Sequence, residues 1–251
     1  MSENRNKMLY GSGVFTTAAI FENKPFRWSS HWQRLSANAA RLGIDVSAYD
    51  ESPVLQIIEK AAIENNISDG KARITFYDER AASLWSSDSG DVVTSLDVLI
   101  GKRQSGAAKF LLTTSPYSLN SRSPLAGIKS CNYLENILTL DEAKGRGFHE
   151  AVRMNENGHV TSAAMANIFW LRDGVVNTPS VTTGCLAGTT REYILENLNC
   201  REVEAQIEEL QTADAIFLSS AGLGVVEVAE FDTRTLAPSD HPIKTKLPWA
   251  K

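Results

Sequence analysis

Short runs of β-branched and aromatic residues recur along most of the chain, and this spacing constrains the fold more than any other feature. Runs of this kind predict strands when Gly, Pro, Asn, Asp or Ser residues bound them. In the first half they cover residues 14–21, 72–77, 96–101 and 109–115. In the second half they cover residues 150–155, 159–163, 167–172, 175–179 and 215–231. So many short strands, interrupted by a few helical segments, predict an α+β fold with mixed sheets and flanking helices.

Helices and turns fit between these strands. Apolar residues at helical spacing predict helices at residues 31–44, 54–66, 132–147 and 189–198. The first of them follows Ser29 and Ser30, either of which is a suitable N-cap residue. Asp173-Gly174 stands between two strand-like runs, and this dipeptide predicts a β-hairpin with a two-residue turn.

A long irregular stretch, residues 115–128, separates the two blocks of strands. It contains Pro116, Pro124 and several Ser and Asn residues. Domain boundaries commonly fall in segments of this composition. We therefore expect two domains, a small N-terminal α/β domain of residues 1–115 and a larger domain of residues 116–251.

The composition excludes several classes of function. The formal net charge of −5 gives no basic surface, so we expect no nucleic-acid partner. Cys131, Cys185 and Cys200 are widely spaced, and the four histidines have no metal-ligand spacing, so neither a disulfide scaffold nor a metal site is expected. The N-terminus has no secretory segment, and no apolar stretch approaches the ~20 residues of a membrane span. These features favour a cytoplasmic protein without membrane association.

Lys129 stands at a place where chemistry is common. It follows a run of small and apolar residues, 125–128, and precedes a predicted helix beside the expected domain boundary. Ligand sites are frequent between domains. A buried lysine whose pKa is lowered can form an imine with a carbonyl group. By position alone, a solvated lysine at a helix start is the commoner alternative.

A second candidate is the start of the helix predicted at residues 189–198. Gly188 precedes Thr189 and Thr190, so two hydroxyls accompany the exposed backbone N–H groups of the first turn. Such a helix N-terminus binds anions and would suit a phosphate. Ordinary helix capping by threonine is the alternative.

Taken together, these segments resemble a known family. The stretch YGSGVFTTAAIFENKPFRWSSHWQRLSANAARLGI contains an H-x-x-R-L motif, and SPLAGIK, ANIFW, TP and LAGTTRE follow it in order. The set resembles the class IV aminotransferases, the fold-type IV pyridoxal-phosphate enzymes, over roughly residues 10–230. The resemblance implies that family's two-domain fold and pyridoxal 5′-phosphate as the cofactor.

The resemblance also implies roles for individual residues. Lys129 would hold the cofactor as a Schiff base and then move the proton at the reacting carbon. Arg34, in the H-x-x-R-L motif, would bind the cofactor phosphate. Tyr133 would donate a hydrogen bond to the oxygen on the cofactor ring. Thr189 and Thr190 would complete the phosphate site, and Ser219 and Ser220 lie where a second loop on the phosphate side falls in this family.

One position departs from the family pattern. In the segment HVTSAAMAN the family usually has an acid directly after the V-T pair, and this acid keeps the pyridine nitrogen of the cofactor protonated. Here Ser162 stands at that position. A hydroxyl cannot stabilise a pyridinium as a carboxylate does, so we expect a weaker electron sink.

The residues around Thr17 indicate which reaction of the family is expected. Phe15-Thr16-Thr17 resembles the aminodeoxychorismate lyases, which form 4-aminobenzoate and pyruvate for folate biosynthesis, whereas branched-chain aminotransferases usually have glycine at position 17. The lyases often have a basic residue where Ala19 stands. Its absence leaves the anchor of the substrate carboxylate open, and the candidates are Arg73, Arg80 and Arg122.

We therefore consider three functions, and in the two enzymatic ones the substrate is a small molecule with an amino group. A lyase of the aminodeoxychorismate type comes first, and a branched-chain or D-amino acid aminotransferase comes second. The third is a weakly catalytic protein that binds the cofactor. The resemblance also implies a homodimer, because a partner loop completes the site in this family and most oligomers have two-fold symmetry.

Overall fold

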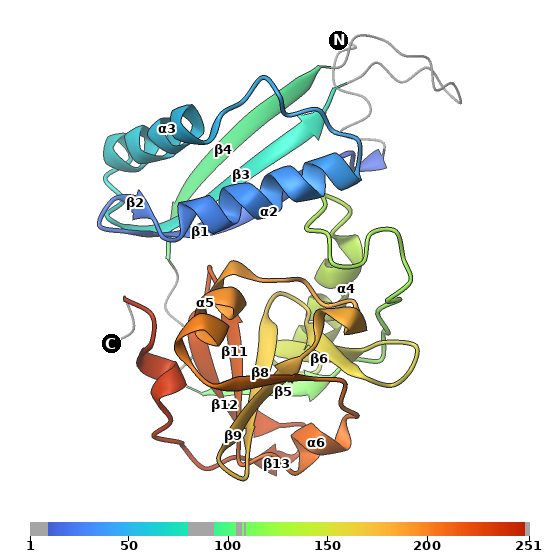
Figure 1. Ribbon diagram of the computed structural model, residues 1–251. Helices are drawn as coiled ribbons and strands as arrows, with labels where there is room; N and C mark the ends of the chain where they lie inside the picture. The colour runs from blue at the N-terminus through green and yellow to red at the C-terminus, as the bar shows by residue number, and fades with distance from the viewer. Residues whose placement is uncertain (1–9, 80–92, 104–106, 108, 249–251) are drawn as a thin grey trace. The chain divides into compact units, whose positions relative to one another are not determined.

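The computed structural model describes residues 10–79, 93–103, 107 and 109–248 (Figure 1). The chain forms two compact units. Unit 1 consists of Met1–Arg103 and Ile128–Tyr133, and unit 2 of Gln104–Gly127 and Leu134–Lys251. Arg80, one of the candidate substrate anchors, lies outside the described residues.

Unit 1 is an antiparallel sheet with two helices. The sheet has the strand order β2-β1-β3-β4. Its elements are β1 (Gly13–Phe21), β2 (Lys24–Pro25), α2 (Trp28–Arg41), α3 (Glu51–Glu64), β3 (Asp69–Asp78) and β4 (Thr94–Lys102). Alternate residues of β1, such as Val14 and Ile20, form a core with apolar residues of both helices. The other face of β1 carries Phe15, Thr17 and Ala19, since neighbouring strand residues point to opposite faces.

Helix α2, which follows β2, begins earlier than the sequence suggests. Its N-cap is Arg27, which has the left-handed φ of 53° and makes no side-chain capping hydrogen bond. The prediction of Ser29 or Ser30 as the cap is wrong, because both serines lie inside the helix and bind elsewhere. Ser29 donates to Glu51, and Ser30 accepts a hydrogen bond from Arg27. The cause is the tight turn after β2, which starts the helix directly at Trp28.

Unit 2 is built on one sheet of nine strands. Eight follow the order β10-β9-β8-β11-β12-β5-β6-β7, and β13 pairs with β12. The strands are β5 (Phe110–Thr114), β6 (Glu150–Met154), β7 (Val160–Ala163), β8 (Asn167–Arg172), β9 (Val175–Pro179), β10 (Cys200–Val203), β11 (Ala215–Ser220), β12 (Gly224–Phe231) and β13 (Arg234–Thr235). The predicted hairpin is confirmed: β8 and β9 pair across Asp173 and Gly174, whose positive φ values of 49° and 75° suit this turn.

Helices flank the sheet of unit 2, as Figure 1 shows. They are α4 (Leu134–Gly145), α5 (Thr189–Asn197) and the short α6 (Glu208–Gln211), with 3-10 turns at Val181–Thr183 and Pro242–Thr245. Trp170 and Ile216 belong to the larger of two apolar cores in this unit, and Phe169 and Phe217 to the other. No helix of the described residues is both long and apolar enough to cross a membrane.

The division into units differs from the boundary expected between residues 115 and 116. β5 belongs to unit 2, because it pairs in parallel with β6 and β12. The segment Ile128–Tyr133 belongs to unit 1, because it pairs with the edge of β1. The sequence marked the irregular stretch between the blocks of strands, but strand pairing decides which unit each flanking segment joins.

Candidate active site

Lys129 is fixed to the edge of β1 by its backbone. The N–H of Phe15 donates to the Lys129 carbonyl at 2.9 Å, and the N–H of Cys131 donates to the Gly13 carbonyl at 2.8 Å. A Cβ on Gly13 would lie 2.9 Å from both the Cys131 sulfur and the Phe76 carbonyl oxygen, so glycine suits this position between the two neighbouring segments. This pairing places the lysine side chain beside Phe15.

Two aromatic rings and a hydroxyl surround the Lys129 amine. Nζ lies 4.4 Å from the centre of the Phe15 ring and 4.7 Å from that of Tyr133. It donates a hydrogen bond to the Tyr133 hydroxyl at 3.2 Å. The two rings meet edge to face, with centres 5.1 Å apart. Tyr133, assigned to the cofactor from the sequence, is therefore a neighbour of the amine.

The surroundings lower the pKa of Lys129 to about 7. Burial is the main cause, and the positive charges of Arg34 and Arg73 add to it. Desolvation and like charges both disfavour the ammonium form. Near neutral pH roughly half of the lysine is therefore an uncharged amine, the form that attacks a carbonyl group. The solvated lysine that is commoner at a helix start does not fit this environment.

Arg34 is held by a network that the sequence did not reveal. Its guanidinium donates to the Thr16 hydroxyl at 2.8 Å, and this hydroxyl lies 2.6 Å from Nδ1 of His31. Because Arg34 can only donate, the Thr16 proton is available to His31. Burial, with the charges of Arg34, Lys129 and Arg27, holds the pKa of His31 well below its usual value. The histidine of the H-x-x-R-L motif is thus a buried neutral partner in the arrangement that holds Arg34.

Arg73 and Thr17 are neighbours on β3 and β1. They are directly opposite in the strand register and half-buried. The Arg73 guanidinium stacks on the Phe15 ring, 3.5 Å from its centre, and Nε makes one long hydrogen bond to Thr75 at 3.4 Å. Within the part of the chain that the structure describes, no carboxylate forms an ion pair with Arg73. An arginine in this state can bind a substrate carboxylate.

Arg122, by contrast, is not in such an environment. Its side chain is 85% exposed and lies 3.8 Å from Glu156 in a turn of unit 2. The surrounding turn is held by Glu156, which accepts hydrogen bonds from the backbone and hydroxyl of Ser121. Of the described candidates, Arg73 therefore has the surroundings that better suit an anchor for a carboxylate.

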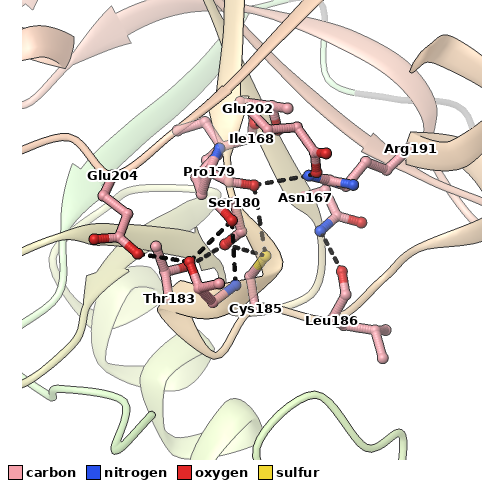
Figure 2. Close-up of polar contacts among 12 residues, drawn as sticks. Asn167, Ile168, Pro179, Ser180, Thr183, Cys185, Leu186, Arg191, Glu202 and Glu204 are labelled. Atoms are coloured by element: carbon pink, nitrogen blue, oxygen red, sulfur yellow. Dashed lines mark hydrogen bonds and ion pairs between the residues drawn. The ribbon is translucent and has the colours of Figure 1, made fainter.

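In unit 2, the start of α5 is packed tightly against β8. Gly188 is the N-cap residue, and a Cβ on it would lie 2.0 Å from Oδ1 of Asn167. The Asn167 amide in turn donates to the Leu186 carbonyl at 2.8 Å (Figure 2). Thr189 and Thr190, the first helical residues, are buried. The glycine is therefore required for the loop to approach Asn167 and for the helix to begin where it does.

Arg191 anchors the same turn of α5 from the other side. Its guanidinium donates to the Pro179 carbonyl at 2.8 Å and binds Glu202, as Figure 2 shows. The helix start is thus fixed to the end of β9 as well as to β8. A rigid helix N-terminus with buried hydroxyls and backbone N–H groups suits an anion.

Ser219 and Ser220 close the same region of unit 2. Ser219 is directly opposite Asn167 in the β11–β8 pair, and its buried hydroxyl has no hydrogen-bond partner among the described residues. Ser220 accepts a hydrogen bond from the Leu223 N–H at 3.1 Å, in the turn between β11 and β12. The strand register therefore connects the serines to the α5 start, through Asn167.

Ser162 lies on β7, near a buried acid on the adjacent strand. Glu150 of β6 is 2% exposed and accepts hydrogen bonds from the N–H groups of Ala151, Ala164 and Met165 at 3.0–3.1 Å. Burial raises the pKa of Glu150 to about 7, against these three bonds. Glu150 was not singled out from the sequence, since its only signal is an acid at the start of a buried strand.

A family model described as amino-transferase class IV matches residues 13–231.

The chain belongs to the class IV aminotransferases.

Its relatives within the family have different activities. The chain is 27% identical over 236 residues to an aminodeoxychorismate lyase of Bacillus subtilis, covering 89% of this chain and 79% of the relative. It is 25% identical over 247 residues to a D-alanine aminotransferase of Listeria monocytogenes, covering 95% and 85%. The crystal structure of a branched-chain aminotransferase from Thermoproteus uzoniensis has the same fold, with a TM-score of 0.88, 24% identity and coverage of 96% and 84%. These similarities confirm the fold-type IV architecture but leave the reaction open.

Class IV enzymes use pyridoxal 5′-phosphate, and the residues of this chain fit that group. In unit 1, the Lys129 amine has the lowered pKa that imine formation with the cofactor aldehyde requires. In unit 2, the approach of Gly188 to Asn167 fixes a helix N-terminus of the kind that binds phosphate. When bound, the cofactor supplies an electron sink for the carbon next to the substrate nitrogen.

Proposed function

We propose that this enzyme is a lyase that acts on 4-amino-4-deoxychorismate and releases 4-aminobenzoate and pyruvate. The proposal rests on Thr17 and Arg73, which are paired across β1 and β3 beside Phe15, the ring that also contacts the Lys129 amine. A hydroxyl at position 17 is typical of the lyases, and the substrate carries carboxylates that an unpaired arginine can bind.

In this proposal Lys129 holds the cofactor and then serves as the base and acid at the reacting carbon. With a pKa of about 7 the free amine can accept a proton and return it near neutral pH. Arg73 binds a substrate carboxylate, and Thr17 contributes a hydroxyl next to it. The substrate divides into the two products without an added reactant, so Lys129 need only move protons.

The cofactor phosphate is assigned to residues that the structure holds rigidly. We assign Arg34 to it because Thr16 and the neutral His31 fix the guanidinium. Thr189 and Thr190 are assigned because they open a fixed helix N-terminus, which suits an anion. Ser220 is assigned because it follows Ser219, which is opposite Asn167 in the β11–β8 pair. Tyr133 is assigned to the ring oxygen, since its hydroxyl already binds the amine of Lys129.

The test uses the purified enzyme with its cofactor and two sets of substrates. Given 4-amino-4-deoxychorismate alone, it should form pyruvate and 4-aminobenzoate in equal amounts, with no need for an amino acceptor. D-Alanine and the branched-chain amino acids, each offered with a keto acid, should give slow or no transfer. Rapid transfer together with no 4-aminobenzoate would overturn the lyase proposal.

An amino-acid aminotransferase is the second candidate. It is favoured by the similarity to D-alanine aminotransferases over 95% of the chain. Arg73, which forms no ion pair with a carboxylate of the described residues, would then bind the one carboxylate of an amino-acid substrate. Binding of pyridoxal phosphate without turnover of either set of substrates would instead support a weakly catalytic cofactor-binding protein.

We also propose a homodimer. Leu134, Ile137 and Leu138 lie on one face of α4 and are 66%, 42% and 52% exposed. An exposed apolar face of this kind marks an interaction surface, and two-fold pairing is the commonest arrangement of soluble oligomers. A cytoplasmic location remains a prediction from the sequence.

A further inference from the structure

An arginine lies directly opposite the residue that replaces the acid of the family. Arg153 of β6 pairs with Ser162 of β7 in the strand register. Side chains of residues paired in this way are neighbours on the same face of a sheet. Arg153 is also 2% exposed, which makes it one of the largest fully buried side chains of the chain.

The partners of Arg153 use only part of its guanidinium. One nitrogen, Nη2, donates to the Ser118 carbonyl at 3.0 Å and to Glu135 at 3.1 Å. Glu135 itself is 80% exposed, so solvent weakens this ion pair. Nε is buried and has no hydrogen-bond partner among the described residues. A buried guanidinium is expensive unless it is fully paired, so packing alone does not explain an arginine here.

The buried acid on the same strand does not take over the missing role. Glu150 is three residues before Arg153, and alternation along a strand directs the two side chains to opposite faces. Both oxygens of Glu150 are already engaged by backbone N–H groups of residues 151, 164 and 165. The other charged group that acts on Glu150 is Lys144 of α4. The charge paired with Ser162 on this face is therefore positive.

We propose that Arg153, with Ser162, keeps the pyridine nitrogen of the bound cofactor unprotonated. This inference rests on the proposed function, with pyridoxal phosphate as the cofactor, and on the family pattern, which implies that position 162 faces the pyridine nitrogen. The Ser162 hydroxyl donates a hydrogen bond to the neutral nitrogen. The nearby guanidinium disfavours a second positive charge and lowers the nitrogen pKa by about 1–3 units. The exchange of an acid for serine thus acts together with a buried cation.

The protonation state can be read directly from the nitrogen NMR shift of ¹⁵N-labelled pyridoxal phosphate in the loaded enzyme. The wild type should show a neutral pyridine at pH 7. Arg153→Leu should raise the nitrogen pKa by about 1–3 units, and Arg153→Lys should keep it low. Arg172→Leu is the matched control, because Arg172 lies on β8 and pairs with Glu209, and it should leave the shift unchanged.

A second comparison separates the arginine from the serine. Ser162→Glu alone should protonate the nitrogen only in part, since the new carboxylate would pair with Arg153 across the strands. Ser162→Glu combined with Arg153→Leu should protonate it fully. If instead Ser162→Glu gives the same nitrogen pKa in both backgrounds, Arg153 has no part in the effect.

The two levels of the proposal fail in different ways. A protonated nitrogen in the wild type at pH 7 overturns the inference whether or not the variants fold. A wild-type protein that forms no borohydride-reducible adduct at Lys129 overturns the cofactor assignment, before any nitrogen shift is measured. Circular dichroism of each variant shows whether it has folded, and Arg153→Lys provides the comparison if Arg153→Leu has not.

Discussion

Replacing Gly188 with alanine adds one methyl group at the point where the α5 start meets β8. The backbone of Gly188 has a φ of −73° and a ψ of 139°, which any residue can adopt. Backbone strain therefore does not enter, and the effect is purely steric. The new Cβ would lie 2.0 Å from the side-chain oxygen of Asn167 and 3.6 Å from Cβ of Arg191.

The size of the expected loss of stability follows from the hydrogen bond of Asn167 that the new methyl group disrupts. Real Cβ atoms keep about 3.0 Å or more from such neighbours, so the oxygen must move by about 1 Å. This movement disrupts the 2.8 Å hydrogen bond to the Leu186 carbonyl. A buried polar group left unpaired costs about 1–3 kcal/mol, and overpacking of a close contact costs a similar amount. We expect the free energy of unfolding to fall by about 2–5 kcal/mol.

The assay is urea unfolding of the cofactor-free protein, followed by tryptophan fluorescence, to which Trp170 contributes as a buried residue of β8 three positions after Asn167. The matched control is Gly145→Ala, at the end of α4, where an added Cβ meets nothing within 4 Å. It should leave stability unchanged or raise it by about 0.4–1 kcal/mol, because alanine suits a helical position better than glycine. Affinity for pyridoxal phosphate should fall in Gly188→Ala and stay unchanged in Gly145→Ala.

A double variant tests the contact itself. Asn167→Ala removes the oxygen that the new methyl group meets, so the two substitutions combined should cost less than the sum of the single ones. The reasoning is refuted if Gly188→Ala unfolds at the wild-type urea concentration, or if the two costs simply add.

Four further predictions concern other parts of the molecule. Because the pKa of Lys129 is about 7, the rate of cofactor uptake should rise about tenfold from pH 6 to 8, whereas the rate at a free lysine would rise about a hundredfold. Lys129→Ala should lose cofactor uptake at this position but remain folded. Arg73→Leu should raise KM for a carboxylate substrate about 10–100-fold, with a smaller effect on kcat, and a kcat loss alone would argue against an anchor. The pKa of Glu150 rises on folding from 4.5 to about 7, so folding binds a proton and about 3 kcal/mol of stability is lost as the pH rises through this range. Glu150→Gln should abolish this dependence, as urea unfolding at pH 5 and pH 8 would show. Leu138→Glu should shift sedimentation from dimer to monomer, and Ile63→Glu, at an exposed site on α3, should not.

Most of the secondary structure could be read from the sequence, because it depends on local patterns. Runs of β-branched residues gave β1, β3 and β8 within one to three residues, and Asp173-Gly174 gave the hairpin. The start of α2 was misplaced, since the cap depends on the turn after β2 and not on the serines nearby. The order of short motifs along the chain also identified the family, and it singled out Lys129 as the candidate for the cofactor lysine.

The chemical environment of those residues came only from the tertiary structure. The sequence indicated Lys129, but its lowered pKa depends on Arg34 and Arg73, which come from distant segments of unit 1. Likewise, the sequence showed Ser162 as a departure from the family pattern, whereas only the register of β6 and β7 showed that Arg153 is its neighbour. Strand register is decided by which faces of the sheet are buried, because a shift by one residue would move every side chain of the strand to the opposite face. The sequence therefore determined which residues can react. Their pKa values and their partners were determined by packing between segments that lie far apart along the chain.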